Sequence, residues 1–187
     1  MTKSRRIIVP PLSRDALASL YAGDEVEITG TIFTARDAAH KRFSDLLSRG
    51  KKLPVDLNGQ ILYYTGPTPV NPATGGCSAG PTTSSRMDRY TPQLLAKTGL
   101  AAMIGKGNRS GAVIDEIVRR RAVYFAAGGG LGALLGCRIA SSRVVCYPDL
   151  GPEAVYELRV ENFPVIVAVD SRGNNIYVSG PQRFSSR

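Results

Sequence analysis

Short apolar runs rich in β-branched and aromatic residues alternate along this chain with segments whose apolar residues recur at helical spacing. The runs that we expect to be strands are 24–34, 61–66, 101–105, 122–126, 142–147, 154–160 and 163–170. The expected helices are 13–23, 35–50, 91–99 and 110–121. Domains with such alternation bury the apolar faces of their helices against a sheet. The pattern therefore predicts an α/β fold.

Glycines mark where two of these elements bend or end. The strand 24–34 is expected to break or bend at Gly30, because glycine weakens the interior of a strand. The helix that follows stops at Gly50, a residue type common just after a helix. This helix begins with Arg36 and Asp37, which are therefore expected beside the end of a strand.

Two further expectations concern the second half of the chain. The helix 110–121 should turn Val113, Ile117 and Val118 inward. Residues 170–175, with the sequence DSRGNN, favour a hairpin-like turn before the apolar residues that follow.

Length and composition predict a single domain. With 187 residues, 43% of them hydrophobic, the chain can bury a core of its own. We expect one domain over 1–187, with a core of about residues 12–178 and short flexible tails. The longest apolar run, Ala122 to Cys137, is shorter than the roughly 20 residues of a membrane span. The N-terminal residues also lack the apolar stretch of a secretory signal, so we predict a cytoplasmic protein without a membrane segment.

The cysteines do not form a recognisable metal-binding motif. Cys77, Cys137 and Cys146 are widely spaced, contain no C-x-x-C pair, and cannot all form disulfides within the chain. An iron–sulfur site made by this chain alone is therefore not expected, and a metal would come from outside the chain.

The chain is basic, with a formal net charge of +9. Its basic residues are scattered in short groups without interleaved aromatic residues, which is not typical of a nucleic-acid-binding surface. An anionic substrate or an acidic partner subunit accounts better for the charge.

Three cations stand at places where loops or helix starts are expected. Arg36 begins a helix, Arg86 follows the hydroxyl-rich stretch 80–85, and Lys106 lies between two glycines. Arginine and lysine bind the two ends of a dicarboxylate, and a positioned hydroxyl such as that of Thr82 can exchange a proton. Together these residues indicate a site for a small anion.

Each of these residues also has an ordinary structural interpretation. Arg36 could pair with Asp37 at a helix start, and Arg86 could pair with Asp88. A lysine in an exposed turn needs no function, although the glycines beside Lys106 would let backbone amides approach a ligand.

Two other features favour a structural role. The sequence GGGLGA matches G-x-G-x-x-A at Gly128, Gly130 and Ala133, but a suitably spaced acidic residue is missing, since Asp149 follows too soon. Close packing of a helix on the sheet explains these glycines better than a dinucleotide does. His40 is expected to be a satisfied or solvent-facing histidine without metal-binding partners.

The chain resembles a known family over roughly residues 12–177. The segments TARDAAHKR, YYTGPTP, SAGPTTSSRMD, MIGKGNRS, AVYFAAGGG and YPDLGPEAVYELRVENFPVIVAVDSRGN follow one another as in the β subunit, or C-terminal domain, of class I fumarases and L-tartrate dehydratases. These are iron–sulfur-dependent hydro-lyases. The resemblance implies a swivelling β/β/α fold, with a mixed sheet and flanking helices.

The resemblance also implies a mechanism shared between two subunits. An α subunit would hold a 4Fe–4S cluster with one open iron that acts as a Lewis acid, and this chain would hold no metal. Arg36, Arg86 and Lys106 resemble the residues that bind the substrate carboxylates, and Thr82 resembles the catalytic threonine. The implied assembly is a hetero-oligomer that binds a C4 dicarboxylate, and neither nucleic acid nor a membrane.

The implied reaction is the interconversion of malate and fumarate, with L-tartrate dehydration as the alternative. Ser85 stands where members of the family often have glycine, which bears on the identity of the substrate more than on the type of reaction. A noncatalytic anion-binding or assembly module is the alternative of another class.

Overall fold

The computed structural model describes residues 6–68 and 78–184, and the side chains of these residues up to 181. Within this part of the chain, seven strands join one sheet. The strands are β1 (Arg6–Ile8), β2 (Glu25–Thr34), β3 (Ile61–Tyr63), β4 (Ala102–Gly105), β5 (Val123–Ala126), β6 (Ile139–Cys146) and β7 (Val155–Val169). The helices are α1 (Arg14–Ala18), α2 (Asp37–Ser48), α3 (Thr91–Thr98), α4 (Gly111–Arg120), α5 (Gly132–Gly136) and α6 (Ile176–Phe184), with short 3-10 helices η1 (Ser84–Met87) and η2 (Pro148–Glu153).

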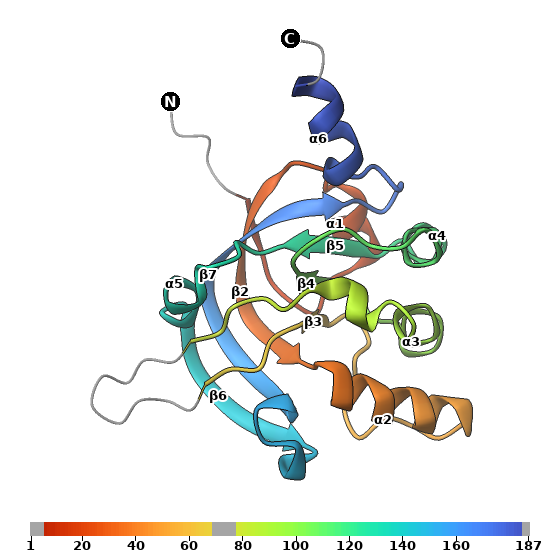
Figure 1. Cartoon of the computed structure of the whole chain (residues 1–187), viewed down its shortest axis with the longest axis vertical. Coiled ribbons are helices and arrows are strands. Elements are labelled where there is room, and N and C mark those ends of the chain that lie inside the picture. Colours follow the sequence, from red (N-terminus) through yellow and green to blue (C-terminus); the bar gives the residue numbers. More distant parts are fainter. Residues whose placement is uncertain (1–5, 69–77, 185–187) are drawn as a thin grey trace.

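The sheet closes on itself as a mixed barrel. Its order is β1-β2-β3-β4-β5-β7-β6, and the strands from β1 to β5 run parallel to their neighbours. β7 runs antiparallel to β5, β2 and β6, so that its pairing with β2 completes the ring. In Figure 1, β2 and the long β7 cross the molecule side by side, while α2, α3 and α4 lie along one flank. The predicted α/β fold with a mixed sheet and flanking helices is confirmed.

Alternate side chains of the same strands fill two separate cores. Ile104 and Phe125 point into the barrel, whereas Met103 and Tyr124 pack toward the helices on the outside. Successive residues of a strand face opposite sides of a sheet, so both faces of β4 and β5 must be apolar. The helices contribute buried residues such as Phe43 to the outer core.

Most of the predicted elements are present, including the bend at Gly30. The pairing of β2 with β7 shifts register between Ile28 and Gly30, where the glycine has φ +130°. A residue with a Cβ atom would be strained in this conformation. Ser13 caps α1 by accepting a hydrogen bond from the Ala16 amide at 3.1 Å.

Two expectations about the second half of the chain were wrong, concerning a pair of strands and one helix residue, whereas the expected turn is present. The two strands expected over 154–170 form the single strand β7, which passes through Asn162 at φ 48°. The hairpin-like turn at 170–175 is closed by the antiparallel bridge between Val169 and Asn175, and the chain then enters α6. In addition, Val118 is 40% exposed, because it lies about 100° around α4 from the buried Ile117.

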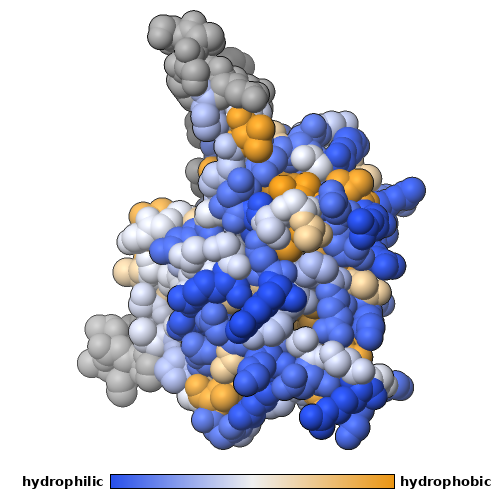
Figure 2. Space-filling view, turned by 45° about the vertical axis from the view of Figure 1, so that its right-hand side comes forward, coloured by the Kyte–Doolittle hydropathy of each residue, from blue (hydrophilic) through white to orange (hydrophobic). Residues whose placement is uncertain are grey.

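No helix in the described part of the chain is long and apolar enough to cross a membrane. The apolar run 122–137 divides into β5 and α5, as expected. The face shown in Figure 2 is mainly hydrophilic, with small separate apolar patches.

Candidate functional site

The candidate site lies where four parallel strands end. Residues after β2, β3, β4 and β5 lie at one edge of the barrel, because parallel strands point their carboxyl ends the same way. Arg36 follows β2, Gly66 follows β3, Lys106 follows β4 and Gly128 follows β5. Ligands of α/β sheets commonly bind at this edge.

Arg36 is held at the start of α2 by an acidic residue from a distant part of the chain. Its Nη2 atom lies 3.4 Å from Oε1 of Glu153, and Oε2 of Glu153 accepts a hydrogen bond from the Ala38 amide at 2.9 Å. A Cβ atom at position 66 would lie 3.1 Å from Arg36 Nη1 and 2.7 Å from the Pro152 carbonyl. Gly66 therefore leaves the space that the guanidinium occupies.

Arg86 connects the start of α2 to Thr82. Its Nη2 atom donates to Asp37 Oδ2 at 2.9 Å and to Thr82 Oγ1 at 3.2 Å. The Thr82 amide donates to the Tyr64 carbonyl at 2.7 Å, which fixes this segment beside β3. The Arg86 side chain is 46% exposed and so remains accessible to a ligand.

The ion pairs differ from those considered from sequence. Arg86 pairs with Asp37, Arg36 pairs with Glu153, and Asp88 pairs with the buried Arg109. The fold thus pairs these arginines with carboxylates that are distant in sequence.

Lys106 extends from the end of β4 with an exposed side chain. Among the described residues, its ammonium group has no ion pair. The glycines beside it act differently from the expectation. A Cβ atom at Gly105 would lie 1.9 Å from Ser84 Oγ, so this glycine accommodates the serine, while Gly107 adopts φ +81°. The Lys106 amide donates to Ser84 Oγ at 3.1 Å and is already occupied.

His40 is buried directly behind Arg36. Its Nδ1 atom lies 2.9 Å from the Arg36 carbonyl, while Nε2 has no partner among the described residues. Burial lowers the pKa of His40 to about 4, so the ring is neutral at pH 7. Because a carbonyl can only accept, the neutral ring carries its proton on Nδ1 and helps to orient the Arg36 peptide.

The GGGLGA segment forms a loop and the first two residues of the five-residue helix α5. A Cβ atom at Gly132 would lie 2.6 Å from Ser78 Oγ and 3.2 Å from the Gly80 amide nitrogen. The Ala79 amide also donates to the Gly132 carbonyl at 3.1 Å. These glycines thus permit close packing of α5 on residues 78–80, which lead into Thr82, and α5 is too short to resemble the helix of a dinucleotide-binding turn.

The described residues offer no ligand set for a metal cluster. No group of three or more His, Cys, Asp or Glu side chains among them could hold a metal ion. Cys137 and Cys146 are free thiols, and Cys77 lies outside the described residues.

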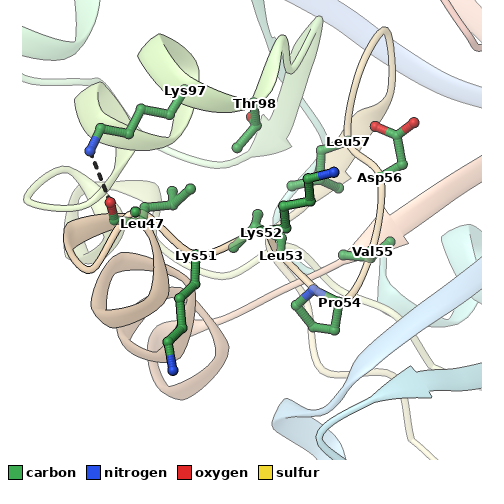
Figure 3. Close-up of a pocket in the computed structure, with 11 residues that line it drawn as sticks. Leu47, Lys51, Lys52, Leu53, Pro54, Val55, Asp56, Leu57, Lys97 and Thr98 are labelled. Atoms are coloured by element: carbon green, nitrogen blue, oxygen red, sulfur yellow. Dashed lines mark hydrogen bonds between the residues drawn. The ribbon is translucent and has the colours of Figure 1, made fainter.

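A surface hollow of about 660 Å³ lies away from these residues, at the C-terminal ends of α2 and α3. Its wall combines apolar side chains such as Leu53 and Val55 with the exposed Lys51, Lys52 and Lys97. Figure 3 shows Lys97 reaching the Leu47 carbonyl, to which it donates at 2.9 Å. None of the four predicted site residues lines this hollow.

Comparison with known proteins gives consistent matches over most of the chain. The family described as fumarase C-terminus matches residues 2–180. A Methanocaldococcus jannaschii protein provisionally named L(+)-tartrate dehydratase subunit beta is 42% identical over 89% of this chain and 88% of its own length. The anaerobic class I fumarate hydratase of Escherichia coli is 39% identical over 86% of this chain, and fumarate hydratase 2 of Leishmania major is 36% identical over 88% of it. The matched region is 30% of the E. coli protein and 29% of the Leishmania protein.

Proposed function

The chain belongs to the fumarase C-terminus family, and from this premise we propose that it is the β subunit of an iron–sulfur-dependent hydro-lyase acting on a C4 dicarboxylate. We propose the interconversion of malate and fumarate as its reaction. L-tartrate dehydration is the second candidate, because the relative from M. jannaschii carries that name and aligns along nearly its whole length.

The observation that carries this proposal is the contact of Arg86 with Thr82 at the barrel edge. A guanidinium nitrogen lies 3.2 Å from the threonine hydroxyl oxygen, and Arg36 and Lys106 follow the neighbouring strands. Cations spaced along one edge suit a molecule with a carboxylate at each end, and arginine binds carboxylates through two parallel hydrogen bonds. We therefore assign substrate binding to Arg36, Arg86 and Lys106.

Thr82 is proposed to exchange the carbon-bound proton. A threonine hydroxyl is a weak acid, so its deprotonated form needs stabilisation by nearby positive charge. Arg86 supplies a hydrogen bond to Oγ1 and a positive charge, which the Asp37 carboxylate partly offsets. When the proton leaves the substrate carbon, negative charge spreads into the adjacent carboxylate, where arginine and lysine side chains stabilise it. In the hydration direction Thr82 returns the proton to carbon.

We assign the removal or addition of the substrate hydroxyl to a partner subunit. Because the relative from M. jannaschii is named as a subunit beta, we propose that an α subunit is the partner of this chain and holds the 4Fe–4S cluster, which would supply a Lewis acid for the substrate hydroxyl. Each step assigned to this chain concerns only the carboxylates and the carbon-bound proton. The resulting enzyme is a hetero-oligomer, and we expect it in the cytoplasm.

The test is an anaerobic assay of this chain with a cluster-bearing α subunit from the same organism, after reconstitution of the cluster. Malate, fumarate and L-tartrate serve as substrates, and each isolated subunit is the control. We expect turnover only in the complex, and the preferred substrate decides between the two candidates. A complex with an intact cluster that converts none of the three would contradict the proposal and favour a noncatalytic anion-binding module.

A further inference from the structure

Ser84 lies midway between Thr82 and Arg86 in the sequence, and its side chain is buried, unlike those of the residues on either side. Thr83 and Ser85 are exposed, whereas Ser84 is fully buried. A buried hydroxyl must find hydrogen-bond partners to offset its loss of water. The partners of Ser84 all lie on, or lead to, the loop that carries Lys106.

A continuous chain of hydrogen bonds passes through this serine. The Lys106 amide donates to Ser84 Oγ at 3.1 Å, Ser84 Oγ lies 2.9 Å from the Tyr124 hydroxyl, and Tyr124 donates to the Gly107 carbonyl at 2.9 Å. A phenol has one proton, and Gly107 can only accept it. Ser84 must therefore donate to Tyr124. This series of hydrogen bonds begins at the Lys106 amide and ends at the Gly107 carbonyl.

The surrounding structure leaves these hydrogen-bonded groups little freedom to move. The Ser84 amide also donates to the Lys106 carbonyl at 3.0 Å, which joins the two segments by a second bond. Any side chain at Gly105 would collide with the serine hydroxyl. Burial raises the pKa of Tyr124, so its phenol keeps the proton that it donates to Gly107.

A second contact fixes the other end of the Thr82-bearing segment. The buried Arg109 donates through Nε to Asp88 Oδ1 at 2.7 Å, and the Ser110 amide donates to Asp88 Oδ2 at 2.7 Å. The Arg109 guanidinium lies 4.9 Å from the centre of the Tyr124 ring. Tyr124 thus contacts both attachments of the segment to the Lys106 loop.

We propose that Ser84 and Tyr124 are positioning residues, which set the position of Thr82 relative to the backbone that carries the Lys106 side chain. This inference rests on the roles proposed above for Thr82 and Lys106. Neither positioning residue contacts the substrate. Both act through the backbone, because Ser84 is two residues from Thr82 and is hydrogen-bonded to both the amide and the carbonyl of Lys106.

The proposal predicts a particular kinetic effect. A displacement of about 1 Å at a catalytic group can cost on the order of a hundredfold in rate. Loss of the hydrogen-bond chain should therefore lower kcat about tenfold to a hundredfold. KM should change less, because Arg36 is held by Glu153 and does not depend on the hydrogen bonds of Ser84 and Tyr124.

The test uses the reconstituted complex with Ser84→Ala, Tyr124→Phe and the double variant, and measures kcat and KM for each. Because the two hydroxyls belong to one series of hydrogen bonds, the double variant should lose little more kcat than either single variant. The matched control is Ser44→Ala, which removes a half-buried hydroxyl that donates to Gln93 between α2 and α3. This control should retain kcat within about twofold.

Two readouts separate positioning from simple loss of stability. Thermal unfolding gives the stability of each variant, and amide exchange in the full-length chain reports directly on the bond from Lys106 to Ser84. We expect exchange of the Lys106 amide to accelerate in Ser84→Ala. Unchanged kcat in the folded Tyr124→Phe complex would overturn the proposal, whatever its melting temperature. If Ser84→Ala does not fold, Tyr124→Phe alone decides the outcome.

Failure of this inference can be told from failure of the proposed function. If the wild-type complex is active but both variants keep full kcat, only the positioning role is wrong. If the wild-type complex converts none of the three substrates, the proposed function fails, and the positioning role fails with it.

Discussion

Arg86 shares a single guanidinium nitrogen between the Asp37 carboxylate and the Thr82 hydroxyl. The carboxylate holds the arginine in place, and the arginine in turn orients the hydroxyl. Asp37 was noted in the sequence as a helix-start residue, but its contact with Arg86, 49 positions away, is a property of the folded chain. We therefore expect the chemistry of the site to depend on Thr82 and Arg86 in different ways.

Replacement of Thr82 should remove catalysis and leave the fold intact. In the complex, Thr82→Ala is expected to lower kcat by about 10²–10⁴, the usual contribution of a general acid or base. Thr83→Ala is the matched control, because Thr83 is exposed and its side chain makes no capping hydrogen bond. Steady-state assays of both variants at equal cluster content measure the difference. Near-normal turnover by Thr82→Ala would remove this residue from the mechanism.

Replacement of Arg86 by lysine should weaken substrate binding while the charge is kept. Lysine has a single nitrogen, so it cannot contact Asp37 and Thr82 and also bind a substrate carboxylate through two parallel hydrogen bonds from a planar group. Because the side chain is 46% exposed, we expect a loss in kcat/KM near the lower end for charged hydrogen bonds, about tenfold. Arg89→Lys alters an exposed arginine stacked on Tyr90 and should behave like the wild type. An unchanged kcat/KM for Arg86→Lys would argue against a bidentate contact.

His40 should make stability depend on pH in mildly acidic solution. Its pKa is lowered by burial from 6.5 to about 4 in the folded chain, so the unfolded chain binds the proton first as pH falls. This contribution is complete above about pH 6.5 and is lost progressively down to about pH 4, with a total on the order of 3 kcal/mol. Urea unfolding at several pH values should show a flatter profile for His40→Leu than for the wild type. Parallel profiles would contradict the buried neutral histidine.

At the scale of elements, the barrel edge is assembled from the loops that follow β2, β3, β4 and β5. Two glycines let side chains from neighbouring segments approach one another closely. Gly66 leaves room for Arg36, and Gly105 leaves room for Ser84. These glycines serve contacts within the protein, which local sequence patterns do not distinguish from contacts with a ligand.

Gly105→Ala should destabilise the chain, because its Cβ atom would lie 1.9 Å from Ser84 Oγ and force the serine to move. Overpacking of this kind costs about 1–3 kcal/mol. Gly111→Ala at the start of α4 is the matched control, since a Cβ atom there meets open space. It should be neutral, or stabilising by up to about 1 kcal/mol. Denaturant unfolding compares the two variants, and equal stabilities would show that the site near Ser84 is looser than described.

At the scale of the whole molecule, the net charge of +9 should influence association with the α subunit. Opposite charges on two partners speed their encounter, and salt screens this attraction. If the positive charge serves the partner interface, the dissociation constant of the two subunits should rise between about 50 and 500 mM salt. Titration calorimetry or interferometry with the two purified subunits measures this. A dissociation constant independent of salt would assign the charge to another role, such as the attraction of an anionic substrate.

The sequence by itself determined the order and type of most elements. Periodicity, glycines and capping residues act over a few neighbouring residues, so β2, α2, α3 and α4 could be recognised without tertiary contacts. The family resemblance also singled out four candidate residues that the fold locates after parallel strands or in the segment beside them. Their catalytic roles stay predictions.

Only the tertiary structure decided how distant segments meet. The closure of the barrel by β7, the pairing of Arg86 with Asp37 and the contact of Ser84 with Tyr124 join residues far apart in the chain. Local patterns carry no signal for such contacts, because their free energy comes from burial and hydrogen bonding between elements. The same reason explains why residues 176–184 form α6 after an apparent hairpin turn. Position in the folded chain, rather than residue type, selects the partners of each side chain at the site.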